Sequence, residues 1–372
     1  MGKVRIGIVG MGGMGTHHAR KLAAGVVPGA ELTAACDVRP KSLVTARESF
    51  GSDLACFDDL AEFLGAGLVD AVLIATRHFE HPAIAVRCFS HGLHVLTEKP
   101  AGVSTKQVRE MNEAAAASGC VFAIMYNQRT SPVYRKLKEM VDTGELGDIK
   151  RTNWIITSWY RSQSYYDSGG WRATWAGEGG GVLLNQDPHQ LDLWQWFCGM
   201  PSRVRAFCYF GKYHDIEVED DVTAFVEYPN GATGVFVTGT ADAPGTNRLE
   251  VSADKGKVVI EDGRLLFWKL DVPERQFNRE YAGGFGSPQA TRIEVSVEGE
   301  ANGYVAILTN FVQAITDGAE LISPGQEGIR GLAISNAMLL SAWHDDWVCV
   351  PPDEEEFSRE LQKRVQIARY RS

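Results

Sequence analysis

The feature that most constrains the fold is a glycine-rich turn, Gly10-Met11-Gly12-Gly13-Met14-Gly15. An apolar run that predicts a strand, KVRIGIVG, leads into it, and THHARKLAA, which has the period of a helix, follows it. Glycines at the first, third and sixth positions permit a tight turn, let backbone N–H groups approach a pyrophosphate, and allow close packing of helix on strand. The turn therefore predicts a dinucleotide site, with residues 10–15 in contact with the cofactor.

Strand-like and helix-like patterns alternate from Val4 to about Tyr126. The strand-like segments read VRIGIVG, ELTAACD, DAVLIA, LHVLT and VFAIMY, and a helix over 105–118 is closed by Gly119. This alternation indicates parallel strands joined by right-handed crossovers. We therefore expect residues 1–126 to form a Rossmann domain with a doubly wound parallel α/β sheet.

The second half of the chain has a different pattern of predicted secondary structure. Strand patterns follow one another as RVRAFCYFG, DVTAFVEYP, ATGVFVTG, NRLEVSA, GKVVIED and GRLLFWK, and helical patterns close the chain near 303–317 and 325–344. Turn signals between the strands favour antiparallel pairing. We expect residues 127–372 to form an α+β domain with a large, mostly antiparallel open sheet that binds substrate. An open apolar sheet face needs a cover, which predicts a homodimer or homotetramer through this sheet.

Composition excludes several classes of function. The 372 residues carry a net charge of −10, which argues against a nucleic-acid partner. The seven cysteines are scattered without a Cys-x-x-Cys pair, which predicts reduced thiols and no metal site. No stretch approaches eighteen apolar residues and no cleavable leader is recognisable, so we expect a cytoplasmic protein with no membrane partner.

An acidic residue, Asp37, ends the second predicted strand, twenty-two residues after Gly15. A carboxylate there accepts hydrogen bonds from both ribose hydroxyls and repels a 2′-phosphate, which favours NAD. Arg39 weakens this preference, because a guanidinium could hold the phosphate of NADP. Its alternative interpretation is an exposed charge beside Pro40.

Two further segments carry candidate chemistry. Glu98-Lys99-Pro100 follows a strand at the carboxyl edge of the parallel sheet, where a lysine could stabilise a developing alkoxide. The other segment runs from Gly179 to His189, and its histidine is a natural base for an alcohol proton. The alternatives are a surface lysine before a turn and a capping or packed histidine.

Several motifs together resemble the Gfo/Idh/MocA family of glucose-fructose oxidoreductases and inositol dehydrogenases. They are GIVGMGGMG, ATRHFEH, HVLTEKP, MYNQR with PVYRKLKEMVDTGELGDIKR, and GGGVLLNQDPHQLDLWQW. The resemblance implies a two-domain enzyme with NAD(H) or NADP(H) that acts on sugars, inositols or related polyols. The NQ…PHQLDLWQW variant, with WRATWAGEGGG, is most similar to levoglucosan dehydrogenase and related 3-hydroxyl sugar dehydrogenases.

The resemblance also assigns roles to single residues. Lys99 and His189 match the catalytic lysine and histidine, and both would contact the substrate. Asn185 replaces the aspartate that the family places four residues before that histidine, and an amide can bind a sugar hydroxyl but cannot take its proton. The resemblance also implies a set of cofactor contacts. They are residues 10–15, Asp37, Arg39, Thr76, His78, His81, Glu98, Lys99, Asn127, Trp171 and Arg172. Arg77 stands where the family has a proline.

Aromatic residues crowd the segment before the glycine run: Trp154, Trp159, Tyr160, Tyr165, Tyr166, Trp171 and Trp175. Their faces could form a platform for a sugar, with Tyr160 and Arg161 as substrate contacts. The alternative for any single ring is packing in a core or an interface.

The sequence thus predicts an NAD(P)-dependent oxidoreductase that moves a hydride to or from a secondary hydroxyl of a sugar or polyol, such as a levoglucosan-like anhydrosugar or a pyranose. Inositol dehydrogenase is the alternative within the family. A redox-neutral, NAD-dependent glycoside hydrolase and a non-catalytic NAD sensor are alternatives of other classes.

Overall fold

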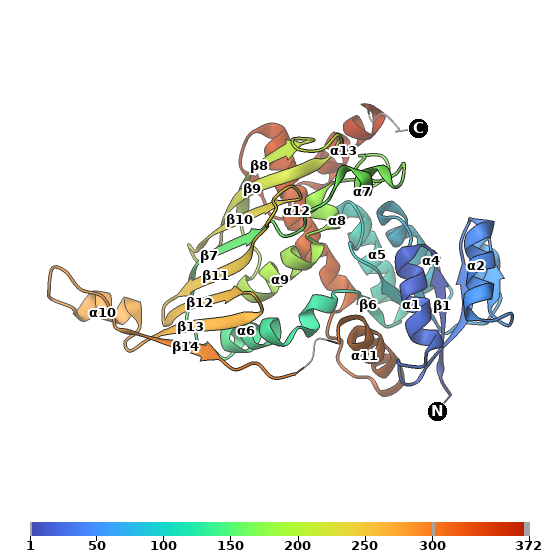
Figure 1. Ribbon diagram of the computed structural model, residues 1–372, viewed down its shortest axis with the longest axis horizontal. Coiled ribbons are helices and arrows are strands. Elements are labelled where there is room, and N and C mark those ends of the chain that lie inside the picture. Colours follow the sequence, from blue (N-terminus) through green and yellow to red (C-terminus); the bar gives the residue numbers. More distant parts are fainter. Residues whose placement is uncertain (1, 300–301, 368–372) are drawn as a thin grey trace. The chain divides into compact units, whose positions relative to one another are not determined.

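The computed structural model describes residues 2–299 and 302–367, which form two compact units (Figure 1). The first unit runs to Thr130 and also takes in Asn302–Leu332, and the second unit holds the remaining described residues. The predicted domain boundary between residues 126 and 127 stays a prediction. The structure adds that the chain, after leaving the first unit at Thr130, returns to it over Asn302–Leu332.

A six-stranded sheet forms the centre of the first unit, in the order β3-β2-β1-β4-β5-β6. Every pairing is parallel, so the predicted doubly wound Rossmann sheet is confirmed. Its strands are β1 (Val4–Val9), β2 (Ala30–Cys36), β3 (Ala55–Phe57), β4 (Ala71–Ile74), β5 (His94–Thr97) and β6 (Phe122–Ile124). The strand order reverses between β1 and β4, which is where such sheets bind their ligands.

The helices of this unit connect the strands. They are α1 (Gly13–Ala23), α2 (Pro40–Phe50), α3 (Leu60–Gly65), α4 (His81–Ser90), α5 (Thr105–Ser118) and α11 (Gly303–Asp317), with short 3₁₀ turns η1 (His78–Glu80), η2 (Asn127–Thr130) and η3 (Gly325–Glu327). Helix α5 ends at Gly119 in the left-handed conformation, as predicted. The returning helix α11 places Leu308 and Phe311 in one buried cluster with Ile6 and Ile8 of β1.

The second unit is built on a nine-stranded sheet in the order β14-β13-β12-β11-β7-β10-β9-β8-β15. All pairings are antiparallel except that of β7 with β10, so the predicted mostly antiparallel sheet is confirmed. The strands are β7 (Ile149–Ile156), β8 (Arg203–Phe210), β9 (Glu219–Glu227), β10 (Thr233–Gly239), β11 (Asn247–Ala253), β12 (Gly256–Glu261), β13 (Arg264–Leu270), β14 (Ala290–Val295) and β15 (Val348–Cys349).

Its helices are α6 (Pro132–Asp142), α7 (Gln163–Asp167), α8 (Val182–Asn185), α9 (Pro188–Cys198), α10 (Glu274–Glu280) and α13 (Glu354–Ile367), while α12 (Gly328–His344) begins in the first unit. Figure 1 shows α10 at the far end of an arm formed by β13 and β14. The predicted helix over 325–344 begins at residue 328, after the turn η3. No helix within the described ranges is both long and apolar enough to span a bilayer.

One face of the second sheet is anchored by Trp194 of α9. Its ring stacks on Phe236 at 5.2 Å between centroids, and its Nε1 donates a 2.9 Å hydrogen bond to Thr152 Oγ1. A Cβ at Gly234 would lie 2.8 Å from the indole, so glycine is required beneath it. The indole therefore fixes α9, and with it the start of that helix, where His189 lies.

The opposite face of the sheet carries exposed apolar side chains. Phe207, Tyr209, Phe225 and Ile155 are 50%, 51%, 38% and 39% exposed. The strand register places Phe207 and Ile155 in one row across β8, β9, β10 and β7, so these side chains share a face.

Candidate functional site

The glycine-rich turn joins β1 to α1 and can be built only from small residues. Gly10 has φ +95°, and a Cβ there would lie 2.6 Å from the Ala75 carbonyl oxygen. A Cβ at Gly15 would lie 1.9 Å from the Gly10 carbonyl oxygen. Helix α1 begins at Gly13, where an added Cβ would meet nothing within 4 Å. The helix start is thus open to an anion, as the predicted pyrophosphate site requires.

Asp37 lies directly after β2, and its carboxylate is ionised and oriented. Its Oδ2 accepts from the backbone N–H of Met11 at 2.8 Å, and the Arg39 guanidinium binds both carboxylate oxygens at 3.0 Å. Burial would raise the pKa of Asp37, but the bonds from Arg39 and Met11 hold it below its ordinary value. A cavity of about 270 Å³ is lined by Arg39 together with Thr16 and Ser42.

Two predicted cofactor contacts have buried oxygen atoms that the described residues leave unsatisfied. They are Oγ1 of Thr76, which follows β4, and Oδ1 of Asn127, at the start of η2. A buried polar atom without a hydrogen-bond partner costs roughly 1–3 kcal/mol. A ligand with polar groups at these positions would remove that cost.

Glu98 fixes the loop that carries Lys99. Its Oε1 lies 2.7 Å from His18 Nε2 of α1, and its Oε2 accepts from the Lys99 backbone N–H at 3.0 Å. Burial would raise the pKa of Glu98, but the hydrogen bond and charge of His18 hold it below its ordinary value. Lys99 itself is half-buried at the carboxyl edge of β5, and its peptide bond to Pro100 is cis.

His81 connects two loops of the predicted cofactor site. Its Nδ1 lies 2.8 Å from the Pro100 carbonyl oxygen and its Nε2 lies 3.2 Å from the Thr76 carbonyl oxygen. Burial lowers the pKa of His81. The ring of His78 packs edge-on at 6.2 Å. Arg77, which replaces the family's proline, begins the turn η1, and its N–H donates to Glu80.

In the second unit, α8 ends at Asn185 and α9 begins at Pro188, a residue that suits the first turn of a helix. His189 is the second residue of α9 and is buried. The glycine run before α8 allows another strand to approach closely, because a Cβ at Gly181 would lie 2.0 Å from the Glu219 carbonyl oxygen of β9.

Asn185 belongs to a polar group that the sequence did not reveal. Its Nδ2 donates to Glu178 Oε1 and lies 3.4 Å from the Tyr165 hydroxyl oxygen. Glu178 also accepts from the Ala173 N–H at 2.6 Å, and the Tyr165 hydroxyl accepts from Arg172 Nη1 at 2.9 Å. The only sequence signal for Glu178 is its position between glycines in AGEGGG.

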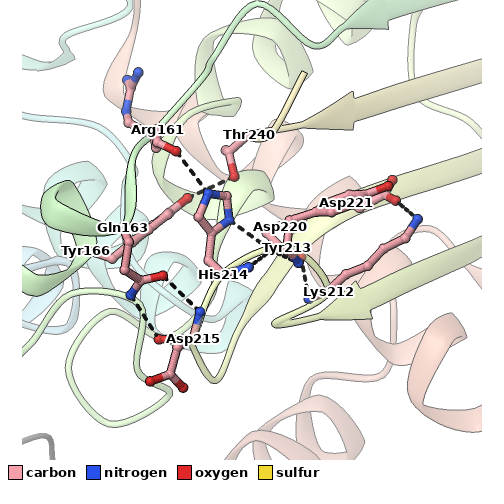
Figure 2. A network of polar contacts seen from close by, with 10 residues as sticks. All are labelled: Arg161, Gln163, Tyr166, Lys212, Tyr213, His214, Asp215, Asp220, Asp221 and Thr240. Carbon is pink, nitrogen blue, oxygen red and sulfur yellow. Dashed lines mark hydrogen bonds and ion pairs between the residues drawn. The ribbon is translucent and has the colours of Figure 1, made fainter. Parts of the chain in front are cut away.

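The aromatic segment divides into buried and accessible rings. Trp154, Tyr166 and Trp175 are buried, so packing is the correct interpretation for these three. The rings of Trp159, Tyr160, Tyr165 and Trp171 remain partly exposed. Tyr160 and Arg161 lie on the loop between β7 and α7, which a polar network around His214 holds in place (Figure 2).

Two profiles of one family match the chain. The oxidoreductase family with an NAD-binding Rossmann fold matches residues 4–126, and the GFO/IDH/MocA C-terminal domain matches residues 134–259. The chain belongs to the Gfo/Idh/MocA oxidoreductase family. This Gfo/Idh/MocA member is an NAD-dependent oxidoreductase of a family of sugar dehydrogenases, which confirms the resemblance found in its motifs.

Three distant relatives of this Gfo/Idh/MocA protein align over nearly their whole length. Myo-inositol 2-dehydrogenase of Thermotoga maritima is 25% identical over 90% of this chain and 95% of its own. Levoglucosan dehydrogenase of Pseudarthrobacter phenanthrenivorans is 22% identical over 94% of this chain and 99% of its own. The structure of the WlbA dehydrogenase from Bordetella pertussis, in complex with NADH and UDP-GlcNAcA, is 26% identical, has a TM-score of 0.80, and matches over 94% of this chain and 100% of that one.

The residues of the first unit fit NAD. The open start of α1 suits the pyrophosphate, the ionised Asp37 suits the ribose hydroxyls, and the unsatisfied oxygens of Thr76 and Asn127 suit a polar ligand.

Proposed function

We propose that this protein transfers a hydride between NAD and a secondary hydroxyl of a sugar or polyol. A levoglucosan-like anhydrosugar or a pyranose is the proposed substrate, and the 3-hydroxyl is a candidate for oxidation. The observation that carries the proposal is the loop after β5, where buried Glu98 fixes the backbone of Lys99 at the carboxyl edge of the NAD-binding sheet. Ligands of such sheets bind at that edge.

The proposed mechanism assigns one task to each polar side chain. Bound NAD supplies the acceptor for the hydride. His189 removes the proton of the substrate hydroxyl, and Lys99 stabilises the charge that develops on the oxygen. Asn185 orients a neighbouring hydroxyl, because its amide forms hydrogen bonds but does not take up a proton. Tyr160 and Arg161 are further proposed substrate contacts.

An inositol is the alternative substrate, and the likeness to the Thermotoga maritima myo-inositol 2-dehydrogenase favours it. The same residues would serve, because an inositol also presents a ring of secondary hydroxyls. The predicted residues 10–15, Asp37, Arg39, Thr76, His78, His81, Glu98, Lys99, Asn127 and Trp171 stay proposed cofactor contacts.

We also propose a homodimer or homotetramer whose contact surface is the exposed face of the second sheet. The support is the row of accessible apolar side chains on that face. The expectation of a cytoplasmic location stays a prediction.

The test is to follow absorbance at the NADH band with NAD or NADP and a panel of levoglucosan, aldoses, glycosides and inositols. Turnover with one anhydrosugar or pyranose, faster with NAD than with NADP, is the expected result. Release of an aglycone without net NADH would instead identify a redox-neutral hydrolase. Absence of any turnover in protein that binds NAD would contradict the proposal.

A further inference from the structure

We propose that Arg161 and Arg172 together bind an oxyanion of the substrate, so that the sugar oxidised by this protein is an acidic one carrying a carboxylate or a phosphate. This inference rests on the proposed function, because it names the class of sugar for the same site. It also moves Arg172 from the predicted cofactor contacts to the substrate contacts.

The two guanidinium groups gather around one ring. The guanidinium carbons of Arg161 and Arg172 lie 5.1 Å and 4.6 Å from the centroid of the Tyr165 ring. Arg172 also donates to the Tyr165 hydroxyl, which lies within 3.4 Å of the Asn185 amide nitrogen. All four side chains are half-buried. The two positive charges thus lie beside a residue already proposed to contact the substrate.

Neither guanidinium has a carboxylate partner among the described residues. Several other arginines of the protein are paired with acids, among them Arg5, Arg39, Arg129, Arg203, Arg205, Arg248 and Arg275. Arg161 has one hydrogen bond from its side chain, to the Tyr160 carbonyl, and its Nε is buried without a partner. Stacking on an aromatic ring compensates a guanidinium charge only in part. An oxyanion beside the Tyr165 ring would supply the missing negative charge.

Arg161 is held in place before any ligand arrives (Figure 2). Its backbone N–H donates to the Thr240 carbonyl at 2.8 Å, and its carbonyl accepts from His214 Nε2 at 2.9 Å. His214 Nδ1 lies 3.0 Å from Asp220 Oδ2, and buried Asp220 also accepts backbone N–H groups from residues 212–214. Because both backbone polar groups of Arg161 are fixed, little backbone freedom remains to be lost on binding.

Tyr166 reinforces the same attachment. Its hydroxyl donates to Thr240 Oγ1 at 2.9 Å, and its ring packs edge-on against His214 at 4.9 Å (Figure 2). In Figure 2 the side chain of Arg161 extends away from this network, which leaves the guanidinium for other contacts. We therefore treat His214 as a positioning residue for Arg161.

The chemistry of the pair selects the ligand class. The planar guanidinium fork matches carboxylate and phosphate oxygens, and such charge-assisted bonds are stronger than bonds between neutral groups. A neutral sugar would offer neither guanidinium a charge-assisted bond. The shared chemistry is an oxyanion on the sugar, and the substrate panel distinguishes a carboxylate from a phosphate.

The experiment compares kcat/KM, with NAD saturating, for D-glucuronate, D-galacturonate and D-glucose 6-phosphate against D-glucose and D-galactose. We expect an acidic sugar to be preferred. Arg161→Gln and Arg172→Gln should each lower kcat/KM for that sugar about 10- to 100-fold, chiefly through KM. The NADH dissociation constant, from fluorescence titration, should stay unchanged. Arg279→Gln, which removes an exposed charge on α10, is the matched control and should behave as wild type. Arg161→Lys keeps the charge and should keep the preference for the acid.

Two results would overturn the inference: a wild-type preference for the neutral sugars, or weaker NADH binding in the Arg variants, which would assign the pair to the cofactor. If no sugar is oxidised, the proposed function fails but the inference is still tested. In that case D-glucuronate and inorganic phosphate are titrated calorimetrically into the NAD complex. Oxyanion binding by the two arginines is supported if wild type binds either ligand and both Gln variants abolish that binding. It is refuted if wild type binds neither ligand.

Discussion

At the scale of single residues, Glu98 shows how the site depends on a buried ionisable pair. Its carboxylate contacts His18 of α1 on one side and the Lys99 backbone on the other. Because both side chains are buried, removal of either one leaves the other buried without its hydrogen-bond and charge partner, which is strongly destabilising. The pair thus couples the helix that begins the nucleotide site to the loop of the proposed catalytic lysine.

Lys99 and His189 are expected to act on the reaction rather than on cofactor binding. Lys99→Ala and His189→Ala should each lower kcat about 10²- to 10⁴-fold, because each removes a group proposed to act in the transition state. NADH affinity, measured by fluorescence titration, should change little. Lys269→Ala and His91→Ala, which truncate exposed side chains, serve as controls. Near-normal turnover in both site variants would exclude the proposed roles.

The sequence could predict some site residues and not others for a physical reason. Gly10, Gly15 and Asp37 follow from local requirements of a turn and a strand end, and the structure places them as expected. The contact of His18 with Glu98 joins positions eighty residues apart, so no spacing in the sequence announces it. The bond from Asn185 to Glu178 is closer in sequence, but a glycine-rich loop has no periodicity from which a side-chain direction follows.

At the scale of elements, length and periodicity decided what could be predicted. Helix α5 and the strands β8 to β13 have regular patterns and clear turn signals, and all were expected. Strand β3 has only three residues, and β7 was missed although it lies mid-sheet, because its parallel partner β10 is about eighty residues further along the chain. Helix α13 was also missed, since it is predominantly polar and buries only Phe357 and Leu361.

The contact between β9 and α8 predicts a pH-dependent stability. Glu219 Oε1 accepts from the N–H groups of Gly181 and Leu183, and burial raises the pKa of Glu219 from 4.5 to about 7. The folded state therefore binds this proton more tightly than the unfolded state does. The stability that the proton contributes is complete below about pH 4.5 and is lost as the pH rises through 7.

Glu219→Gln should remove this dependence, because an amide does not titrate. The free energy of unfolding of wild type should fall between pH 5 and pH 8 by about 2–3 kcal/mol more than that of the variant. Urea denaturation at both pH values measures the difference. Glu294→Gln, on the exposed strand β14, is the control and should follow wild type. If Glu219→Gln keeps the full wild-type fall, Glu219 is not the titrating group.

At the scale of the whole molecule, the exposed face of the second sheet is the feature that a single chain leaves unexplained. Ile155 of β7, Phe207 and Tyr209 of β8 and Phe225 of β9 turn exposed apolar side chains to this face, and the register aligns Ile155 with Phe207 across β10 and β9. Large apolar patches on a protein surface mark interaction sites. A second copy of the chain is the simplest cover, because a two-fold axis lets the same patch meet itself.

Charges on this face should therefore dissociate the proposed assembly. Burial of one phenylalanine side chain contributes about 1.5–3 kcal/mol. A two-fold axis would bury each mutated side chain twice, once from each copy. Phe207→Asp combined with Phe225→Asp should therefore shift the protein to monomers. Size-exclusion chromatography with light scattering measures the mass of wild type and variant at equal concentration. Phe285→Asp is the matched control, because Phe285 is 99% exposed on the arm between β13 and β14 and lies outside the patch. If Phe285→Asp dissociates the assembly and the double variant does not, the contact between copies is made by the arm and not by the sheet face.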